Sequence, residues 1–290
     1  MLQMVKRLAF ICLVCLLLNG CEKYNLISMV IPPSDLVNSR FEQSMRITQG
    51  KAVAQIEAAD EYMFYVCTDT HIDETSINLG AFNSILRNDN DATFGVMLGD
   101  AIDRRDNLPK YLEAIKFSPE IHKFDYTIFN VIGNHDVYFN GWEDYKSLIG
   151  PSVYWFKVKT PSYSDLYITL DSATGTLGRK QFDWLKSFLA ENRNQYRHCI
   201  VFTHVNILYS DLSQLVTSNL PIDETFALLE LFSKYNVELV LQGHDHYRDD
   251  QIFNGVRYTV VGTIEDSVDN PEYITVFVND DNIDLNWHSL

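Results

Sequence analysis

The sequence predicts an α/β protein in which two mixed β-sheets pack face to face, with helices on their outer sides. Apolar, strand-like runs alternate with segments of helical spacing from about residue 61 to residue 241, a pattern typical of a largely parallel sheet. Pairs of β-rich runs then dominate the last third of the chain, and Asn254-Gly255 between two of them is a strong hairpin signal. A chain of 290 residues, 46% of them hydrophobic, can bury a sizeable core.

The first twenty residues predict a secretory signal peptide. Lys6 and Arg7 precede an apolar run over residues 8–18, which is too short to span a bilayer comfortably. The following residues, Leu-Asn-Gly-Cys at 18–21, resemble a bacterial lipoprotein cleavage site, in which the cysteine becomes the lipidated first residue. We therefore expect Cys21 to carry lipid and the protein to be exported and anchored to a membrane of the bacterial cell envelope. A plain signal peptide or a buried apolar segment is the alternative.

Residues 21–58 predict a tether followed by a short N-terminal packing segment. Pro32-Pro33-Ser34-Asp35 has the composition of a loop, and residues 39–46 carry a weak helical signal. One folded domain is expected over residues 59–290, since no internal repeat and no second domain are visible.

The five cysteines do not form a disulfide framework. Cys12 and Cys15 leave with the signal peptide and Cys21 takes the lipid, so that only Cys67 and Cys199 remain. Both lie in apolar, strand-like runs, which favours buried free thiols. One bridge between neighbouring strands is the alternative.

From residue 61 the predicted elements follow in order along the chain. Strands that precede a helix or a polar loop are expected at 62–67, 93–98, 126–132, 199–202 and 237–241. Helices are expected at 77–87, 108–117, 180–191 and 225–235. The helix at 180–191 is amphipathic and carries on one face Phe182, Leu185, Phe188 and Leu189. Paired strands are expected at 154–158 with 166–170, on both sides of Asn254-Gly255, and at 273–278 with 283–287.

The formal net charge of −16 argues against one class of partner. Binding to a nucleic-acid duplex requires a surface rich in lysine and arginine, so none is expected here. An acidic chain can still bind a small anionic substrate if bound metal cations reverse the local field. No protein partner can be inferred.

Five of the predicted strands each end in polar side chains that can bind metal. These clusters contain five of the eight histidines of the chain. Their members are Asp69, His71, Asp100, Asn134, His135, His204, His244 and His246. Ligands of open α/β sheets bind at the carboxyl ends of strands, so a sheet that gathers these ends would bring the clusters together. Any one motif alone is more often a turn or a core residue, but that interpretation must then explain five separate clusters.

The types of ligand indicate a dinuclear centre. Carboxylate oxygen, imidazole nitrogen and amide oxygen suit Mn, Fe or Zn. Seven ligands are too many for one tetrahedral site and match two divalent or trivalent ions that share a carboxylate. Two such ions, roughly 3.5–4 Å apart, can activate a bridging water and stabilise both oxygens of an in-line displacement, which suits phosphoester hydrolysis. Gly99, Gly133 and Gly243 are expected to permit sharp turns after three of the strands.

The ordered motifs resemble those of the calcineurin-like metallophosphoesterases. They are Asp69-Thr70-His71, Gly99-Asp100-Ala101-Ile102-Asp103, Gly133-Asn134-His135-Asp136, Thr203-His204 and Gly243-His244-Asp245-His246. The resemblance covers roughly residues 61–265. It implies the metallo-dependent phosphatase fold, a four-layer α/β/β/α sandwich of two mixed sheets flanked by helices.

The resemblance also implies a role for each site residue. One metal ion would be held by Asp69, His71, Asp100 and His246. The other would be held by Asp100, Asn134, His204 and His244, with Asp100 bridging the two. A water between the metals would be the nucleophile and His135 the general acid toward the leaving-group oxygen, with Asp103 orienting its imidazole.

Three further residues follow from the same motifs. Arg104 resembles the arginine that grips phosphate in one branch of the family, or it is an ordinary surface cation. Asp136 is expected to cap a turn, and Asp245 is expected to point away from the ligands beside it.

The sequence departs from the pattern of some family branches at two positions, which narrows the choice of subfamily. Purple acid phosphatases have a tyrosine where this chain has Asp103, so this protein should not be purple. Many relatives have a proline where this chain has Asn206, which changes the expected loop shape but not the ligand His204.

The substrate stays open at this stage. Aromatic residues follow three of the motifs and could stack on a base or sugar, or could only cover the core; they are Tyr138, Phe139, Trp142, Tyr209 and Tyr247. The expected activity is hydrolysis of a small phosphomonoester or phosphodiester. The alternative is a catalytically silent, metal-binding surface lipoprotein that acts as a binding module.

Overall fold

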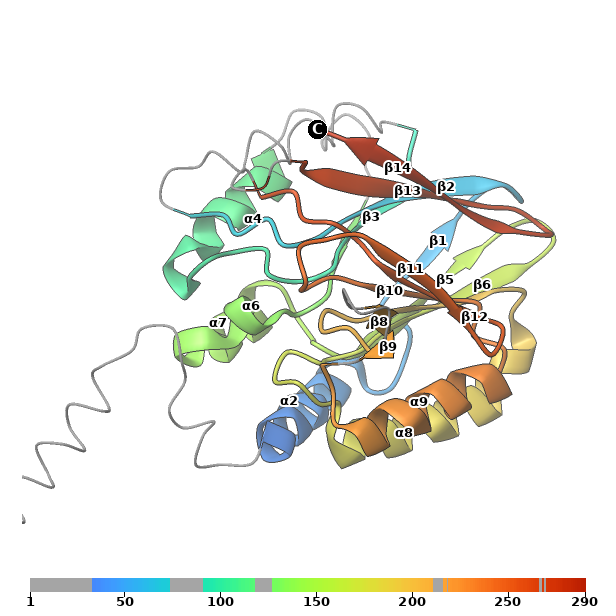
Figure 1. Cartoon of the computed structure of the whole chain (residues 1–290), viewed down its shortest axis with the longest axis horizontal. Helices are drawn as coiled ribbons and strands as arrows, with labels where there is room; N and C mark the ends of the chain where they lie inside the picture. Colours follow the sequence, from blue (N-terminus) through green and yellow to red (C-terminus); the bar gives the residue numbers. More distant parts are fainter. Residues whose placement is uncertain are drawn as a thin grey trace, which may run out of the picture.

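A computed structural model gives the structure of the protein and describes residues 33–73, 91–117, 127–210, 216–217, 219–265, 268 and 270–290 (Figure 1). The signal segment 1–20, the lipidation site Cys21 and the predicted helix at 77–87 lie outside the described residues. Two mixed sheets form the centre of the fold, and helices cover their outer faces. The predicted four-layer α/β/β/α arrangement is confirmed.

The larger sheet has seven strands in the order β1-β5-β6-β7-β10-β12-β11. Their bounds are β1 Gln55–Glu57, β5 Tyr154–Lys159, β6 Ser164–Thr169, β7 Cys199–Phe202, β10 Leu239–Gln242, β11 Asp249–Phe253 and β12 Val256–Val260. Strands β6, β7, β10 and β12 run parallel, whereas β5–β6 and β11–β12 are antiparallel pairs, as predicted. Asn254 and Gly255 connect β11 to β12 with φ values of +49° and +82°, the left-handed conformation that a tight hairpin turn requires.

The smaller sheet has five strands in the order β14-β13-β2-β3-β4. Their bounds are β2 Tyr62–Cys67, β3 Phe94–Met97, β4 Ile128–Asn130, β13 Glu272–Val278 and β14 Ile283–Ser289. Strands β2, β3 and β4 are parallel, and the β13–β14 hairpin adds to them antiparallel. A third pair, β8 Tyr209–Ser210 with β9 Val216–Thr217, was not predicted, because its polar residues carry no strand pattern.

The main core lies between the two sheets. Phe64 of β2 stacks on Phe94 of β3 with ring centroids 4.6 Å apart, and both meet the edge of Tyr167 of β6 in the facing sheet. The next residue of β2, Tyr65, points to the opposite face and is equally buried, in the cluster beneath α4. Because both faces of β2 are buried, its sequence is a continuous apolar run and not an alternating one.

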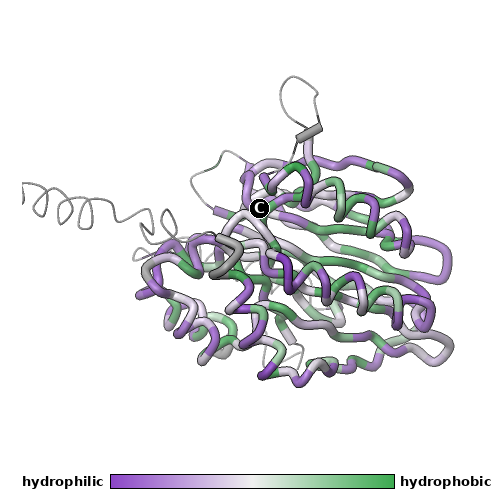
Figure 2. Tube along the Cα trace, turned by 90° about the horizontal axis from the view of Figure 1, so that it is seen from below, coloured by the Kyte–Doolittle hydropathy of each residue, from purple (hydrophilic) through white to green (hydrophobic). Residues whose placement is uncertain are grey.

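Helices cover the outer faces of both sheets. α8 (Gly178–Asn192) and α9 (Ile222–Lys234) lie side by side over the seven-stranded sheet, and α4 (Leu108–Phe117) packs on the five-stranded sheet (Figure 1). The predicted apolar face of α8 is confirmed, since Leu185 and Leu189 are fully buried. Figure 2 shows the strands rich in hydrophobic residues and the helices alternating between hydrophilic and hydrophobic stretches.

The shorter helices lie mostly in the loops around the strand ends. They are α6 Asn134–Val137, α7 Trp142–Leu148 and the 3₁₀ turns Arg105–Asn107, Tyr138–Asn140 and Arg193–Gln195. Among the residues that the structure describes, none of the helices is both long and apolar enough to span a bilayer.

The described part of the N-terminal segment is built into the fold. α2 (Pro33–Thr48) packs along α8, where the rings of Phe41 and Trp184 lie 5.9 Å apart between centroids. β1 forms the edge of the seven-stranded sheet next to β5. Cys67 and Cys199 are buried and free, which confirms the expectation of unbridged thiols.

Candidate metal centre

The five polar clusters meet at one end of the sandwich, but they come from two sheets. Asp69, Asp100 and Asn134 follow β2, β3 and β4 of the five-stranded sheet. His204 and His244 follow β7 and β10 of the seven-stranded sheet. No single sheet gathers these strand ends; the site lies where the ends of two facing sheets come together.

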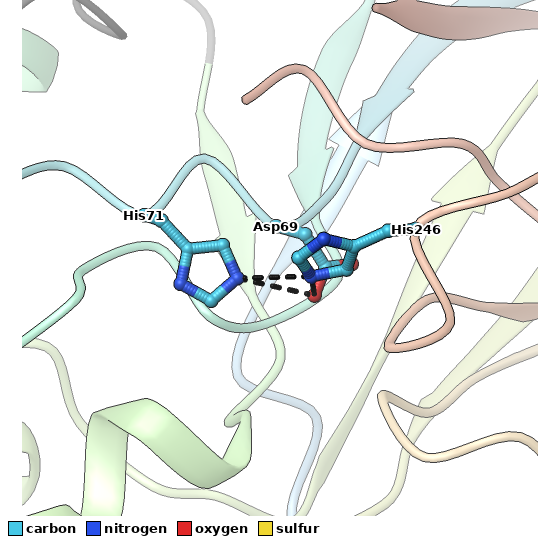
Figure 3. A group of neighbouring side chains, drawn as sticks. All are labelled: Asp69, His71 and His246. Carbon is cyan, nitrogen blue, oxygen red and sulfur yellow. Dashed lines mark hydrogen bonds and ion pairs between the residues drawn. The ribbon is translucent and has the colours of Figure 1, made fainter. Parts of the chain in front are cut away.

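The first group consists of Asp69, His71 and His246 (Figure 3). The Nε2 atoms of His71 and His246 are 3.1 Å apart, and they lie 3.8 Å and 3.3 Å from Asp69 Oδ1. Figure 3 shows the two imidazoles reaching the carboxylate from separate loops. Three potential ligand atoms thus converge on one small volume.

The second group consists of Asp100, His204 and His244. His204 Nε2 lies 3.3 Å from Asp100 Oδ2 and 3.0 Å from the amide oxygen of Asn134. The same Asp100 Oδ2 lies 3.9 Å from the Nε2 of His71. One carboxylate oxygen therefore stands between the two groups.

Hydrogen bonds aim the ligand atoms of the second group. His204 Nδ1 donates to the main-chain oxygen of Leu98 at 2.8 Å, which orients the ring so that Nε2 faces Asp100 and Asn134. Asn134 donates its amide nitrogen to the hydroxyl of Tyr138 at 3.0 Å, which turns its oxygen toward His204. Both side chains are held ready to coordinate a cation.

The backbone is strained where it presents the ligands. Five of the seven predicted ligands have φ between +44° and +78°, in the left-handed region that residues other than glycine rarely adopt. They are Asp69, His71, Asp100, His244 and His246. Each such residue costs free energy, and such residues cluster at functional sites where the surrounding structure holds them.

The three motif glycines act in two different ways. Gly99 has φ +99°, so it permits the expected sharp turn. Gly133 and Gly243 do not have positive φ; they allow close approach instead. A Cβ on Gly133 would lie 2.2 Å from the main-chain nitrogen of Asp100, and one on Gly243 would lie 2.2 Å from the hydroxyl of Thr68.

The electrostatics of the site favour bound positive charge. Burial opposes protonation of His71, but the carboxylates of Asp69 and Asp100 outweigh it and raise the pKa of His71 to about 9. Burial likewise opposes protonation of His204, yet the same two carboxylates raise its pKa to about 10. Burial and the neighbouring His204 lower the pKa of His244 to about 4. The buried carboxylates of Asp69 and Asp100 thus concentrate negative charge that bound cations would neutralise.

A metal ion fits this donor set. Asp69 is fully buried; its Oδ2 accepts hydrogen bonds from the Thr68 hydroxyl at 2.6 Å and from the His244 amide at 2.9 Å. Its Oδ1 makes no hydrogen bond to any described residue. A buried carboxylate oxygen without a donor is costly, and it faces two imidazole nitrogens that metals also accept. The residues present therefore match a cation site.

His135 lies beside the predicted ligands, in a third group of side chains that could hold a metal ion, together with His71 and Asp103. Its main-chain N–H donates to Asp100 Oδ1 at 2.8 Å, and its ring meets that of His71 edge to face at 4.5 Å. Its Nδ1 lies 3.0 Å from the main-chain oxygen of Asp103 and 3.6 Å from its carboxylate. The contact expected from the Asp103 carboxylate is thus made more closely by its carbonyl. Arg104 is half exposed, with Nε 3.8 Å from the same carboxylate.

The two remaining motif aspartates lie as the sequence suggests. Asp136 accepts hydrogen bonds from the main-chain N–H groups of Gly133 and Asp100 at 2.8 and 3.1 Å, so it caps the turn. Asp245 turns away from the ligands and accepts from the amide groups of Asn206 and Asn219. Asn206, where many relatives have proline, thereby links the fourth motif to the fifth.

The aromatic residues near the motifs have different roles. Tyr138 lies 4.9 Å from His135 between ring centroids, and Tyr209 and Tyr247 form a pair 6.3 Å apart. Trp142 packs in a small core cluster with Tyr145 and so covers the core. The Phe139 side chain is outside what the structure describes.

Two residues at the site were missed by the sequence reasoning. The Thr263 hydroxyl donates to the main-chain oxygen of Asp69 at 2.7 Å, and Glu265 Oε2 lies 3.5 Å from His246 Nδ1. Both follow β12, so Gly262-Thr263-Ile264-Glu265 is a sixth polar cluster at a strand end. Like the other five clusters, it could have been predicted from its position directly after a strand.

Comparison with solved structures supports the fold. A dimetal phosphatase from Danio rerio is 13% identical with a TM-score of 0.57, covering 79% of this chain and 96% of that one. A protein described as GAP50, the anchor in the inner membrane complex of Plasmodium, is 15% identical with a TM-score of 0.55, covering 79% and 84%. A purple acid phosphatase from yellow lupin seeds is 14% identical with a TM-score of 0.60, covering 80% of this chain but 52% of that one. Identities this low show the fold alone.

The sequence itself carries the family assignment. No curated protein sequence matches this chain. The family model described as calcineurin-like phosphoesterase matches residues 62–248, which contain every predicted metal ligand. Since this match covers more than half of the chain, the protein belongs to the calcineurin-like phosphoesterases and is a metal-dependent phosphoester hydrolase.

Proposed function

We propose that the protein hydrolyses a small phosphorylated substrate with two metal ions that share Asp100. The supporting observation is the position of Asp100 Oδ2, 3.9 Å from His71 Nε2 and 3.3 Å from His204 Nε2. One ion would be held by Asp69, His71, Asp100 and His246, and the other by Asp100, Asn134, His204 and His244. A pair of Mn, Fe or Zn ions would supply Lewis-acid activation of a water and stabilise charge on the phosphoryl oxygens.

In this proposal His135 is the general acid. Its Nδ1 faces Asp103, so Nε2 is the nitrogen that can give a proton to the leaving-group oxygen. Asp103 orients the ring through its main-chain oxygen at 3.0 Å and through its carboxylate at 3.6 Å. The partial exposure of His135, 28% for its side chain, gives a substrate access to this nitrogen.

Arg104 is the proposed phosphate-binding residue. It adjoins Asp103, and its side chain is 52% exposed, so it can reach toward a substrate bound beside His135. The planar guanidinium can bind two phosphoryl oxygens at once. Arg104→Lys should therefore raise KM more than it lowers kcat, because a point charge replaces a fork. An unchanged KM would leave Arg104 as a surface cation.

The experiment that tests the proposed activity is a substrate panel. Aryl phosphomonoesters, linear and cyclic phosphodiesters and pyrophosphates would be incubated with protein loaded with Mn, Fe or Zn in turn. We expect turnover of at least one class, abolished by a chelator and restored by metal. Protein that contains metal but hydrolyses none of these classes would contradict the proposal.

We also propose that this chemistry takes place on a lipid anchor in a bacterial envelope. The support is the sequence of residues 1–21, with a basic start, a short apolar run and Cys21 at the lipoprotein-like site. The catalytic fold begins with α2 at Pro33, so residues 22–32 would separate the lipid from the fold. Mass spectrometry of the N-terminal peptide after bacterial expression should find diacylglycerol on Cys21. An unmodified Cys21 in the membrane fraction would refute the anchor.

A further inference from the structure

One of the segments that join the two sheets contacts the metal centre through Thr263 and Glu265. β12 ends at Val260 in the seven-stranded sheet, and β13 begins at Glu272 in the five-stranded sheet (Figure 1). Residues 263–265 between them lie beyond the region that the family model matches. They contact the loop after β2 and the loop after β10, which carry ligands of the first group.

Thr263 fixes this segment to the first ligand. Its hydroxyl donates to the main-chain oxygen of Asp69 at 2.7 Å and accepts from the main-chain N–H of Glu265 at 2.9 Å. The N–H of Ile264 donates to the main-chain oxygen of Thr68 at 3.3 Å. Thr263 and Ile264 are buried, so these hydrogen bonds are shielded from water. The backbone of Glu265 is thereby held in a defined position relative to Asp69.

His246 lies between Glu265 and the ligand group. Its Nε2 is 3.3 Å from Asp69 Oδ1 and 3.1 Å from His71 Nε2 (Figure 3). Its Nδ1 is 3.5 Å from Glu265 Oε2. The two nitrogens of one ring therefore face different partners. The side chain of His246 is 34% exposed and that of His204 is fully buried. Packing alone thus holds His246 less firmly.

His204 and His246 have one feature in common: in each ring Nδ1 faces an oxygen atom and Nε2 faces the predicted metal site. The Nδ1 of His204 donates to a main-chain oxygen, that of Leu98, and Nε2 is left to coordinate. A carboxylate in the same position on a metal-binding histidine fixes the tautomer, orients the ring and raises the basicity of the coordinating nitrogen. The Glu265 side chain is 24% exposed, so its charge is partly shielded from solvent at this contact.

We propose that Glu265 is a positioning residue for His246. Its carboxylate accepts the Nδ1–H, so that Nε2 presents its lone pair to the first metal ion. A shift of about 0.5 Å brings the observed contact to ordinary hydrogen-bond length. This inference rests on the proposed dinuclear site, and it adds to that site a residue outside the family motifs. Partners of this kind typically change metal affinity by about 10–100-fold.

The test is the metal affinity of substituted proteins, measured by competition with a chromophoric chelator. Glu265→Ala should lower the affinity for one of the two metal ions about 10–100-fold and leave the affinity for the other unchanged. Glu265→Gln should keep most of the affinity, because an amide oxygen can still accept the hydrogen bond. The matched control is Glu272→Ala. Glu272 is the first residue of β13, and its carboxylate lies next to Gly262 at the other end of this connection. Its removal should leave both affinities unchanged.

A double-substitution cycle then separates positioning from general support of the loop. If Glu265 acts through His246, Glu265→Ala should cost no further affinity once His246→Ala is present. Wild-type affinity in Glu265→Ala, or an equal loss in the His246→Ala background, would overturn the inference while leaving the proposed function intact. A wild-type protein that binds no metal would overturn both, so the two failures are distinguishable.

Discussion

Gly133 and Asp100 approach each other so closely that no side chain fits between them. A Cβ on Gly133 would lie 2.2 Å from both the main-chain nitrogen and the Oδ1 of Asp100. Gly133, which precedes the proposed ligand Asn134, therefore sets the position of Asp100, the proposed shared ligand from the neighbouring strand.

Gly133→Ala should accordingly displace Asp100. We expect a loss of about 1–3 kcal/mol in the free energy of unfolding, from overpacking, together with a severe loss of metal and of turnover. Gly50→Ala is the control, since a Cβ there meets nothing within 4 Å and only the φ of +69° is unfavourable. It should lower stability and leave turnover unchanged. Full metal content in Gly133→Ala would contradict the geometry.

His135→Ala should separate catalysis from metal binding. The imidazole is not among the seven proposed ligands, so both metals should remain bound while kcat falls by about 10²–10⁴-fold, the range for a lost general acid. Substrates with good leaving groups should lose less, because they need less protonation. Metal content and kcat measured on one sample check this. If the rate survives, the role assigned to His135 is wrong.

Arg40 and Asp171 form a buried ion pair that fastens α2 to the fold. The guanidinium donates to both carboxylate oxygens, at 2.7 and 2.8 Å, and both side chains are almost fully buried. Arg40→Ala should destabilise the protein by about 3–5 kcal/mol, because it leaves a buried charge unpaired.

The exposed pair Arg179–Asp183 is the matched control for that prediction. Its charged atoms are 3.6 Å apart and its side chains are largely exposed, so Arg179→Ala should leave stability unchanged. Chemical denaturation of the three proteins provides the comparison. Equal stability of Arg40→Ala and the wild type would mean that this ion pair does not stabilise the fold.

His198 should make stability depend on pH. Its Nδ1 lies 2.7 Å from Glu238 and its Nε2 lies 2.8 Å from the main-chain oxygen of Asn279, so both nitrogens must donate. Burial lowers the pKa of His198, but the hydrogen bonds to Glu238 and Asn279 outweigh it and raise the pKa. The stabilisation is therefore complete below the unfolded pKa of about 6.5 and is lost as pH rises through the raised folded value.

The measurement is the difference in unfolding free energy between the wild type and His198→Gln across that range. It should be largest at low pH and shrink as pH rises. A difference that is the same at every pH would mean that His198 does not change protonation on unfolding. Because His198 lies at the opposite end of β7 from His204, metal binding should not alter the result.

Much of the fold could be predicted because its strands are buried on both faces. The bounds expected for β2, α4 and β7 match those observed, since each is a continuous apolar run or a periodic helix. β1 could not be predicted. Its residues Gln55–Glu57 are largely exposed, and it becomes a strand only by pairing with β5. The sequence pattern also could not predict which strands share a sheet, because β13 pairs with β2 from more than 200 residues away.

The candidate ligands could be proposed from the sequence because the residue types and spacing of metal ligands are set by coordination chemistry. The groups that orient the side chains of the site could not. His204 is oriented by the carbonyl of Leu98, and His135 is oriented most closely by the carbonyl of Asp103, and any residue can supply a carbonyl. Glu265 stands 19 residues after His246 and reaches it only through the path from β12 to β13.

The central claim is that Asp100 is shared by two metal ions. Counting the metals per chain by elemental analysis, for the wild type and for Asp100→Asn purified side by side, tests it most directly. The claim predicts two ions per wild-type chain, and loss of both metals and of turnover in Asp100→Asn, with Asp183→Asn as an exposed control that keeps both. One ion in the wild type, or two tightly bound ions in Asp100→Asn, would contradict it.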